Sequence, residues 1–268
     1  MGFNTVILKK EEHIATIIMN RPHRMNALVP EMFQELKDAL EDVSNDDTIR
    51  VVILTGAGKG FCTGSDIKEG TASGKGAQSE KSIDEVRQHI RHNPQKITLA
   101  IRNMEKPVIA MVNGPAVADG FDWALACDLR VGSENTRFMN AFVRMALFPN
   151  TGETWLLPRI IGLGKALEIL LTGDWLEAEE AYRIGVLNRL VPAADLENET
   201  MSLARKLAQQ PPVSLRLLKM QTYRGLEMSL ESALELAADG EAMTLKTEDY
   251  REALAAFREK REPDFKGK

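Results

Sequence analysis

One acidic side chain in a strand-to-helix turn has the setting that proton-transfer chemistry needs. Residues 112–128 read V-N-G-P-A-V-A-D-G-F-D-W-A-L-A-C-D, and the apolar β run Val108–Val112 stops at Asn113-Gly114-Pro115. A turn of small residues then leads into a helical pattern that brings Asp122 into apolar surroundings. Such a turn leaves backbone N–H groups pointing into a cleft, and the helix N-terminus adds positive potential. The pattern predicts a site that stabilises an anion on a substrate, with an acid beside it.

A second turn of this kind lies upstream and ends another predicted buried strand. Residues 51–55 are followed by G-A-G-K-G-F-C-T-G-S-D over residues 56–66. A dinucleotide-binding fingerprint requires glycine where Phe61 stands, and a phosphate loop requires Ser or Thr where Gly60 follows Lys59. Both nucleotide templates fail, and a tight turn that needs positive φ is the simpler alternative.

Several blocks, in order along nearly all 268 residues, resemble the crotonase (enoyl-CoA hydratase/isomerase) superfamily. They read V-V-I-L-T-G-A-G-K-G-F-C-T-G-S-D-I-K, P-V-I-A-M-V-N-G-P-A-V, A-C-D-L-R-V, L-P-R-I-I-G-L-G-K-A, L-T-G-D-W-L-E-A-E-E-A-Y-R-I-G-V-L-N and F-R-E-K-R-E-P-D-F. The resemblance implies an α/β fold, a spiral of ββα repeats. It also implies that each turn supplies one backbone N–H to an oxyanion hole for the thioester carbonyl of an acyl-CoA. By position the donors are the amides of Ser65 and Asp119.

The resemblance to the family does not determine the reaction, because both positions of the hydratase glutamate pair differ. The resemblance places that pair at Asp122 and Phe142, and a phenyl ring cannot accept a proton. Residues 138–159 are similar to the epoxyphenylacetyl-CoA isomerase and enoyl-CoA isomerase branch, whose working carboxylate lies in the turn that here contains Asn150. An asparagine cannot act as a base.

Three acids are candidates for the working group, and each has an alternative interpretation. Asp122 is favoured, because Phe121 and Trp123 can raise its pKa by desolvation; alternatively it is bonded to the backbone or an arginine. Glu153 is a charge on a helix N-terminus or, less favoured, a relocated base near Asn150. A carboxylate at Asp119 would repel an enolate unless it turns away or pairs.

The same resemblance assigns substrate contacts. Met25 and Ala27 match the block that contacts the adenosine and pantetheine parts of coenzyme A, and Arg24 can meet a phosphate. The first turn adds Ser65, and Asp66 and Ile67 are expected against the adenine. Phe142, Phe148 and Trp155 are expected to line an apolar acyl pocket, although core packing explains them almost as well.

Composition limits the partners. A formal charge of −5 and a pI near 5.6 argue against nucleic acid and an anionic membrane surface. Cys62 and Cys127 read as small buried hydrophobes, and the four histidines are too scattered for a metal site. No cofactor is expected beyond coenzyme A within the substrate. Since there is neither an apolar run of 18 residues nor a targeting peptide, a cytoplasmic location is expected.

Alternating strands and helices predict a parallel sheet with crossovers over residues 1–192. Residues 193–268 read as a helical tail, which family members use for trimer contacts; a homotrimer or a dimer of trimers is expected. Within residues 1–192, Glu69–Gln78 is either a flap over the cleft or a solvated insertion, and a polar stretch from Ser79 to Asn93 follows it.

The sequence therefore favours a crotonase-fold enzyme in which one acid isomerises an acyl-CoA through a stabilised enolate. Hydration, hydrolysis and carbon–carbon bond cleavage on the same fold are the enzymatic alternatives. A catalytically weakened acyl-CoA-binding paralogue is the alternative outside catalysis.

Overall fold

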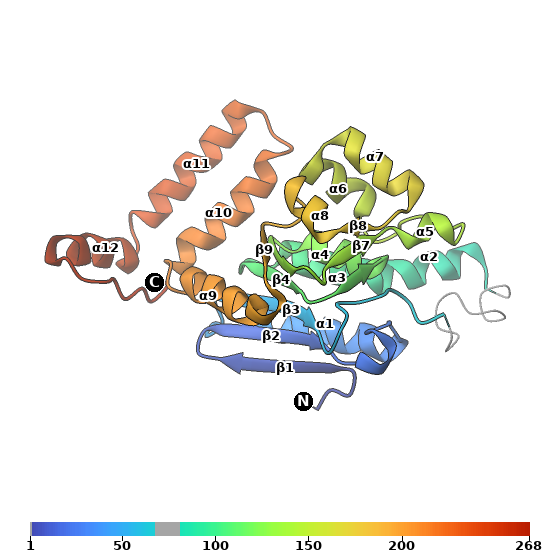
Figure 1. Cartoon of the computed structure of the whole chain (residues 1–268). Helices are drawn as coiled ribbons and strands as arrows, with labels where there is room; N and C mark the ends of the chain where they lie inside the picture. Colours follow the sequence, from blue (N-terminus) through green and yellow to red (C-terminus); the bar gives the residue numbers. More distant parts are fainter. Residues whose placement is uncertain (1, 68–80) are drawn as a thin grey trace.

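The computed structural model describes residues 2–67 and 81–268. Its larger sheet has the strand order β1-β2-β3-β4-β6-β9, and a second sheet has the order β5-β7-β8 (Figure 1). The strands of the larger sheet are β1 (Val6–Glu11), β2 (Ile14–Met19), β3 (Val51–Gly56), β4 (Val108–Val112), β6 (Leu129–Ser133) and β9 (Arg189–Val191). Those of the smaller sheet are β5 (Pro115–Val117), β7 (Arg137–Met139) and β8 (Leu176–Glu177).

The helices lie between and after these strands. In the first 192 residues they are α1 (Pro30–Asn45), α2 (Ile83–His92), α3 (Pro94–Asn103), α4 (Asp119–Ala126), α5 (Ala141–Arg144), α6 (Glu153–Ile161), α7 (Leu163–Thr172) and α8 (Ala178–Arg183), with the 3-10 turn η1 (Pro22–Arg24). The tail contains η2 (Ala193–Asp195), α9 (Leu196–Ala208), α10 (Pro212–Gly225), α11 (Leu230–Thr244) and α12 (Glu248–Glu259).

The predicted parallel sheet is confirmed. β1 and β2 form an antiparallel pair, and every further neighbour in the larger sheet pairs in parallel. All six residues of β3 are buried because helices cover both of its faces. This explains why β3 reads as a continuous apolar run instead of alternating with polar residues.

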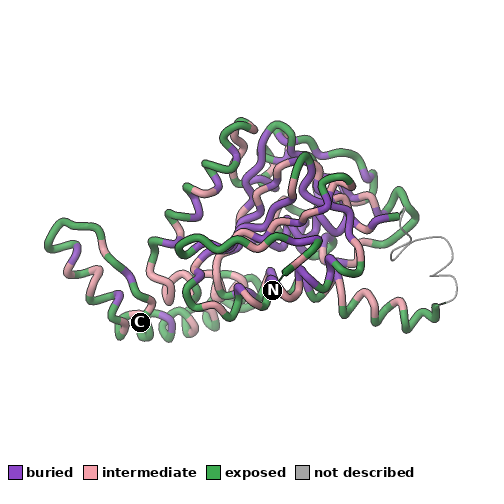
Figure 2. The backbone as a smooth tube through the Cα atoms, turned by 90° about the horizontal axis from the view of Figure 1, so that it is seen from below, coloured by how far each residue is buried: buried purple, intermediate pink, exposed green. Residues whose placement is uncertain are grey.

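Helix α1 begins at Pro30 as the sequence predicts, since proline fits the first helical turn. Its apolar residues recur every three or four positions, and they are buried in the main core together with β2 and β3. Figure 2 shows this core as the densely buried centre of the molecule.

The helical tail divides into two parts. Helix α9 packs against the outer face of the sheet, where Leu196 and Leu203 join a second core cluster with Ile14 and Val51. Helices α10, α11 and α12 extend away from the body as an arm (Figure 1). Within the two described ranges, no helix combines the length and hydropathy needed to cross a bilayer.

The sequence predicts that the segment after the first turn is polar and lies outside the repeating scheme. The predicted flap Glu69–Gln78 lies outside the described residues. The stretch that follows forms α2, which Ser82 and Glu85 begin with a reciprocal capping box. This Ser-x-x-Glu spacing is a sequence signal for a helix start that the interpretation as a polar stretch did not use.

Candidate active site

The two glycine-containing turns meet directly. The Cys62 amide donates to the Pro115 carbonyl at 3.2 Å, and the Val117 amide donates to the Cys62 carbonyl at 2.8 Å. At Gly120, an added Cβ would lie 2.2 Å from the Cys62 carbonyl oxygen. Only glycine therefore allows the start of α4 to lie against the first turn.

The direction of the Ser65 amide follows from the hydrogen bonds of its neighbours. Leu28 pairs with Ser65 in an isolated parallel bridge, in which its amide donates to the Gly64 carbonyl at 2.8 Å and its carbonyl accepts from the Asp66 amide at 2.9 Å. The Ser65 amide consequently points away from Leu28. It donates to no acceptor among the described residues.

The Asp119 amide is set by a backbone conformation that is costly for any residue other than glycine. Ala118 has φ 51° and ψ −122°, and its own amide donates to the Met139 carbonyl at 3.1 Å. Asp119 is the first residue of α4, so its amide has no backbone acceptor within the helix, and the group it meets is its own carboxyl. The turns thus present the amides of Ser65 and Asp119, which we call the two-amide site.

A cavity of about 930 Å³ opens at the two-amide site. Ten of the residues predicted for the site line it: Arg24, Met25, Ala27, Ser65, Asp66, Ile67, Asp119, Phe142, Phe148 and Asn150. Most of the remaining wall is apolar and comes from α2, α5 and the loop after α5, including Val86, Ile90, Met145 and Leu147. A concave, largely apolar cavity with a few polar groups at one place is typical of a small-molecule site.

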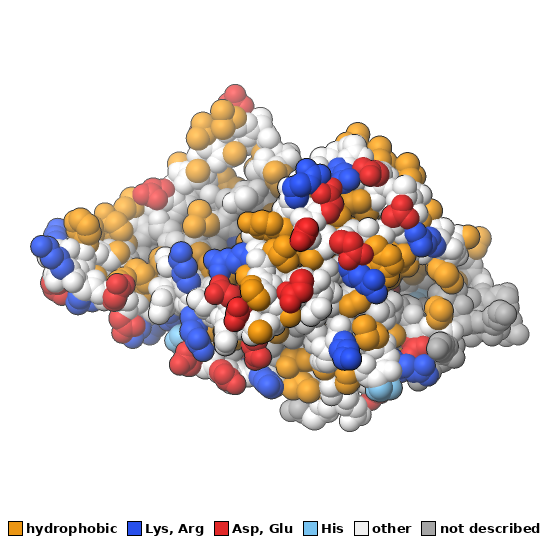
Figure 3. All heavy atoms as spheres, viewed as in Figure 1, with side chains coloured by type: hydrophobic (Ala, Val, Ile, Leu, Met, Phe, Trp, Pro, Cys, Tyr) orange, Lys and Arg blue, Asp and Glu red, His pale blue; other side chains and the backbone are white. Residues whose placement is uncertain are grey.

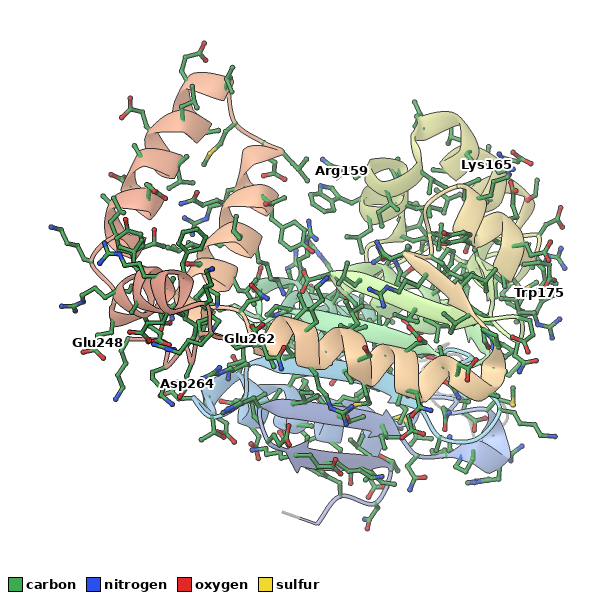
Figure 4. All side chains as sticks on the ribbon, turned by 60° about the vertical axis from the view of Figure 1, so that its left-hand side comes forward. Arg159, Lys165, Trp175, Glu248, Glu262 and Asp264 are labelled. Carbon is green, nitrogen blue, oxygen red and sulfur yellow. The ribbon has the colours of Figure 1, made fainter. Side chains whose placement is uncertain are left out.

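Three residues predicted for the site lie outside this cavity. Asp122 and Glu153 are 0% exposed, behind the cavity wall. The Trp155 ring, expected in the acyl pocket, instead packs against Arg159, whose guanidinium carbon lies 3.8 Å from the ring centroid, and Arg102, at 5.4 Å. Figure 4 shows Arg159 on the side of α6 toward α10 and α11. The contacts of the Trp155 ring with two cations place this ring on a surface of α6, not against the substrate cavity.

Asp119 belongs both to the wall of the cavity and to the two-amide site. Its side chain is 4% exposed and lines the cavity. Burial raises its pKa to about 6, against the opposing effect of its own amide and the hydroxyls of Thr151 and Ser65. A carboxyl with a pKa near neutrality exchanges protons readily in both directions.

Asp122 and Glu153 form a second, deeper pair of acids. The Thr151 hydroxyl donates a short hydrogen bond to Asp122 Oδ2. Burial raises the pKa of both carboxyls well above the usual range, and the charge of Asp122 raises that of Glu153 further. Asp122 Oδ1 and both carboxyl oxygens of Glu153 have no hydrogen-bond partner among the described residues. Glu153 is the first residue of α6, as the helix N-terminus interpretation expects, but a charge there does not fit this burial.

The other predicted contacts differ in what they can offer a substrate. Asp66 lines the cavity, but its Oδ2 accepts from Arg21 Nη1 at 3.1 Å in a buried ion pair. Phe142 packs in a small apolar cluster with Val117 and Met139, whereas Phe148 is largely exposed at the cavity edge. Phe142 therefore supplies an apolar wall near the two-amide site and no proton acceptor.

Basic groups that the sequence interpretation did not assign also line the cavity. His23, Lys81 and His89 join Arg24 there, so two cations and two histidines line a cavity of a chain whose net charge is negative. Burial, followed by the charges of Lys81 and Lys37, lowers the pKa of His89. Within the described ranges, no group of three or more His, Cys, Asp or Glu side chains can hold a metal ion.

Comparisons with known proteins agree with this architecture. Residues 9–268 match the enoyl-CoA hydratase/isomerase family model. The chain is similar to 1,2-epoxyphenylacetyl-CoA isomerase of Escherichia coli, with 36% identity covering 96% of this chain and 97% of the relative. It is also similar to crotonyl-CoA hydratase of Syntrophomonas wolfei, with 35% identity covering 99% of both chains.

A solved structure extends the agreement to the fold. The crystal structure of an enoyl-CoA hydratase from Bacillus anthracis superposes with a TM-score of 0.91 and 31% identity, over 99% of this chain and 100% of that one. This confirms the crotonase-type fold predicted from the sequence blocks. The chain belongs to the enoyl-CoA hydratase/isomerase family.

Proposed function

We propose that this protein moves a proton at the carbon next to the thioester carbonyl of an acyl-CoA, and that it isomerises its substrate in preference to hydrating it. The observation that supports this proposal best is the position of Asp119. Its amide and its carboxyl both belong to the site where the two turns meet, and the residue lines the cavity. The relatives include both isomerases and hydratases, so the family alone does not choose between the reactions.

The amides of Ser65 and Asp119 would bind the thioester oxygen. When the Asp119 carboxylate takes a proton from the adjacent carbon, the electron pair of the broken C–H bond moves onto that oxygen as an enolate. Two preorganised donors stabilise this charge most at that moment, and losing one donor in comparable sites costs roughly 10²–10³ in rate. Return of the proton to another carbon completes an isomerisation.

Assigning proton transfer to Asp119 changes the preference derived from the sequence. Asp122 was favoured there, but its complete burial keeps it from touching a substrate in the cavity. The expected repulsion between Asp119 and an enolate is also avoided, because Asp119 becomes neutral as the enolate forms. The negative charge moves from one oxygen to another, and the net charge of the site stays constant.

Phe142 favours isomerisation over hydration. Hydration requires a water molecule held and activated beside the double bond, which a second acid normally supports. The apolar ring of Phe142 and the amide of Asn150 contribute to the cavity wall in place of such an acid. A single acid is sufficient to move a proton between two carbons.

The basic groups of the cavity suit the anionic coenzyme A part of the substrate. Arg24 and Lys81 would meet its phosphates, while Met25, Ala27 and Ile67 would contact its nucleoside and pantetheine parts.

We further propose a homotrimer or a dimer of trimers, because α10, α11 and α12 expose many large apolar side chains. We expect no cofactor beyond the coenzyme A that is part of the substrate.

A binding protein with little turnover is the second candidate. Phe142 and Asn150 both line the cavity where a second acid would be needed, and a binding function requires neither to ionise. The two candidates share the cavity and the amides, so affinity for an acyl-CoA does not separate them.

Isotope exchange separates them. Several acyl-CoA and enoyl-CoA thioesters are incubated with the protein in deuterium oxide, and the carbon next to the thioester is followed by NMR. We expect deuterium incorporation, formation of the isomeric enoyl-CoA and loss of both in Asp119→Asn by about 10²–10⁴. Asp174→Asn, an exposed acid on the loop after α7, is the matched control. Tight binding without exchange would support the binding protein.

A further inference from the structure

A chain of hydrogen bonds connects α1 with His89 in the wall of the cavity. Lys37 Nζ of α1 donates to Asn93 Oδ1 at 3.2 Å. Asn93 Nδ2 lies 3.0 Å from the His89 carbonyl oxygen and 3.1 Å from His89 Nδ1. His89 lines the cavity with Val86 and Ile90, which share its face of α2. Two residues that do not line the cavity therefore hold a side chain that does.

These contacts fix the tautomer of the His89 ring. An ammonium group can only donate, so the atom of Asn93 that faces Lys37 must be the amide oxygen. The NH2 group of Asn93 therefore faces His89 Nδ1, and this ring nitrogen must accept. The ring hydrogen is then on Nε2, because a neutral imidazole donates through one nitrogen and accepts through the other. A doubly protonated ring would bring two donors face to face at Nδ1.

Electrostatics favours the same neutral form of the ring. Burial lowers the pKa of His89, and the positive charges of Lys81 and Lys37 lower it further. His89 Nε2 makes no hydrogen bond with any described residue. A ring donor in a cavity wall that no described protein group uses can serve a bound molecule.

The position of His89 favours a contact with the acyl part of the substrate over one with coenzyme A. Lys81, proposed above to meet phosphates, precedes the first turn of α2, whereas His89 lies in the last turn. Helix α3 follows directly, and its Gln95 Nε2 donates to the Asn150 carbonyl at 2.8 Å. Asn150 lines the cavity where a second acid would act on the acyl group. The end of α2 that carries His89 is thus tied to the Asn150 loop.

We propose that His89 determines specificity, and that its Nε2–H donates a hydrogen bond to an uncharged oxygen on the acyl group, such as a ketone or ether oxygen. The inference rests on the proposed function, because it places an acyl-CoA in the cavity. The wall next to His89 on α2 and α3 is apolar, with Val86, Ile90 and Pro94. A carboxylate there would exchange its hydration for one neutral donor, which is unfavourable, whereas a carbonyl or ether oxygen loses far less.

Nuclear magnetic resonance tests the tautomer without a substrate. In protein carrying isotope-labelled histidine, long-range proton–nitrogen correlations distinguish a protonated Nε2 from a protonated Nδ1, and His89→Phe identifies the His89 signals by their loss. At neutral pH we expect His89 to be the neutral Nε2–H form. Asn93→Asp replaces the NH2 group with an acceptor, so Nδ1 should become protonated. A native His89 with a protonated Nδ1 would overturn the proposal.

Equilibrium binding tests the preference and needs no turnover. Calorimetry compares hexanoyl-CoA with its 4-oxo and 5-oxo derivatives, which share the coenzyme and the chain length. We expect His89→Phe to weaken binding of at least one oxo derivative, relative to hexanoyl-CoA, by about threefold to tenfold. His92→Phe, on the same helix but exposed and outside the cavity, is the matched control and should keep the native ratio. A ratio that His89→Phe leaves unchanged, or that both variants change equally, contradicts the proposal.

The outcomes separate this inference from the proposed function. If the ratio changes as expected while no thioester undergoes deuterium exchange, the proposed function fails and the recognition by His89 stands. Deuterium exchange with an unchanged binding ratio contradicts the role of His89 alone. Adipoyl-CoA has an acyl group that ends in a carboxylate, and tighter binding of this thioester than of both oxo derivatives would overturn the assignment of an uncharged acceptor.

Discussion

The burial of side chains differs between the first 192 residues and the arm formed by α10, α11 and α12. The catalytic part buries its apolar residues around the sheets and also buries several acids near the cavity. In the arm, the buried residues are Gly240, Asp249 and Ala256, while large apolar side chains such as Leu234 and Phe257 are exposed. Figure 3 shows hydrophobic side chains gathered along this arm.

The difference indicates whether the side chains of each part make their contacts within the chain or leave a surface for another molecule. Polar groups in the catalytic part are held at fixed positions by contacts within the chain, as chemistry at two amides requires. The arm keeps its charged residues Glu248, Glu262 and Asp264 around α12 (Figure 4), and leaves an apolar surface that the rest of its own chain does not cover. We expect changes in the first part to alter reaction rates and changes in the arm to alter assembly.

The contact between the two turns should give the largest effect. Gly120→Ala places a Cβ 2.2 Å from the Cys62 carbonyl oxygen and must displace the Asp119 amide. We expect proton exchange to fall roughly 10²–10³-fold, as for the loss of one oxyanion donor. Gly164→Ala, a helical glycine with nothing within 4 Å of the added Cβ, is the control. Equal exchange rates in the two variants would contradict the assigned position of the Asp119 amide.

A charge on the arm should weaken assembly without affecting the cavity. Phe257 is 85% exposed on α12, and Phe257→Glu would place a charge in the proposed contact between copies. Loss of a central apolar contact costs about 2 kcal/mol or more, so association should weaken at least roughly tenfold. Sedimentation velocity measures this effect, with Leu163→Glu on α7, where the leucine is 66% exposed, as the control. An unchanged mass distribution for Phe257→Glu would count against the arm as the contact surface.

Proton exchange should depend on the charge state of Asp119. Its pKa is raised to about 6, and the carboxylate is the form that accepts a proton, so the rate is full well above pH 6. Below this value the rate should fall about tenfold for each pH unit. Exchange rates measured from pH 5 to pH 8 test this, and a flat profile across that range would exclude Asp119 as the base.

Removing the ionisable group of Glu153 should give the smallest effect, and only at high pH. Because burial raises the pKa of Glu153, the folded state favours its neutral form and loses stability as the pH rises through that raised pKa. Glu153→Gln cannot ionise, so it should match the native protein at low pH and melt higher at alkaline pH, by about 2–4 °C for each kcal/mol recovered. Identical melting curves at alkaline pH would contradict a buried, protonated Glu153.

Much of the fold is readable from local patterns. The proline that begins α1 is explained by a dihedral limit within the first helical turn. The apolar run of β3 and the glycines of both turns are visible in the sequence as local patterns, but distant segments explain them, because helices cover both faces of β3 and Gly120 lies against Cys62. The sequence interpretation placed the aromatic ring of Trp155 in the acyl pocket. In the structure this ring packs against Arg102 and Arg159. Whether such a ring faces a cavity or a pair of arginines depends on how α6 sits against distant helices.

The sequence by itself determined the family, the two turns, and the presence of Phe142 and Asn150 where a second acid would be needed. Only the tertiary structure decided which acid reaches the cavity. Asp119 and Asp122 are three residues apart on α4, and Thr151, 29 positions after Asp122, comes from the segment that begins α6. The exposure and pKa of a carboxyl depend on all the groups packed around it, and those groups come from segments that meet only in the folded chain.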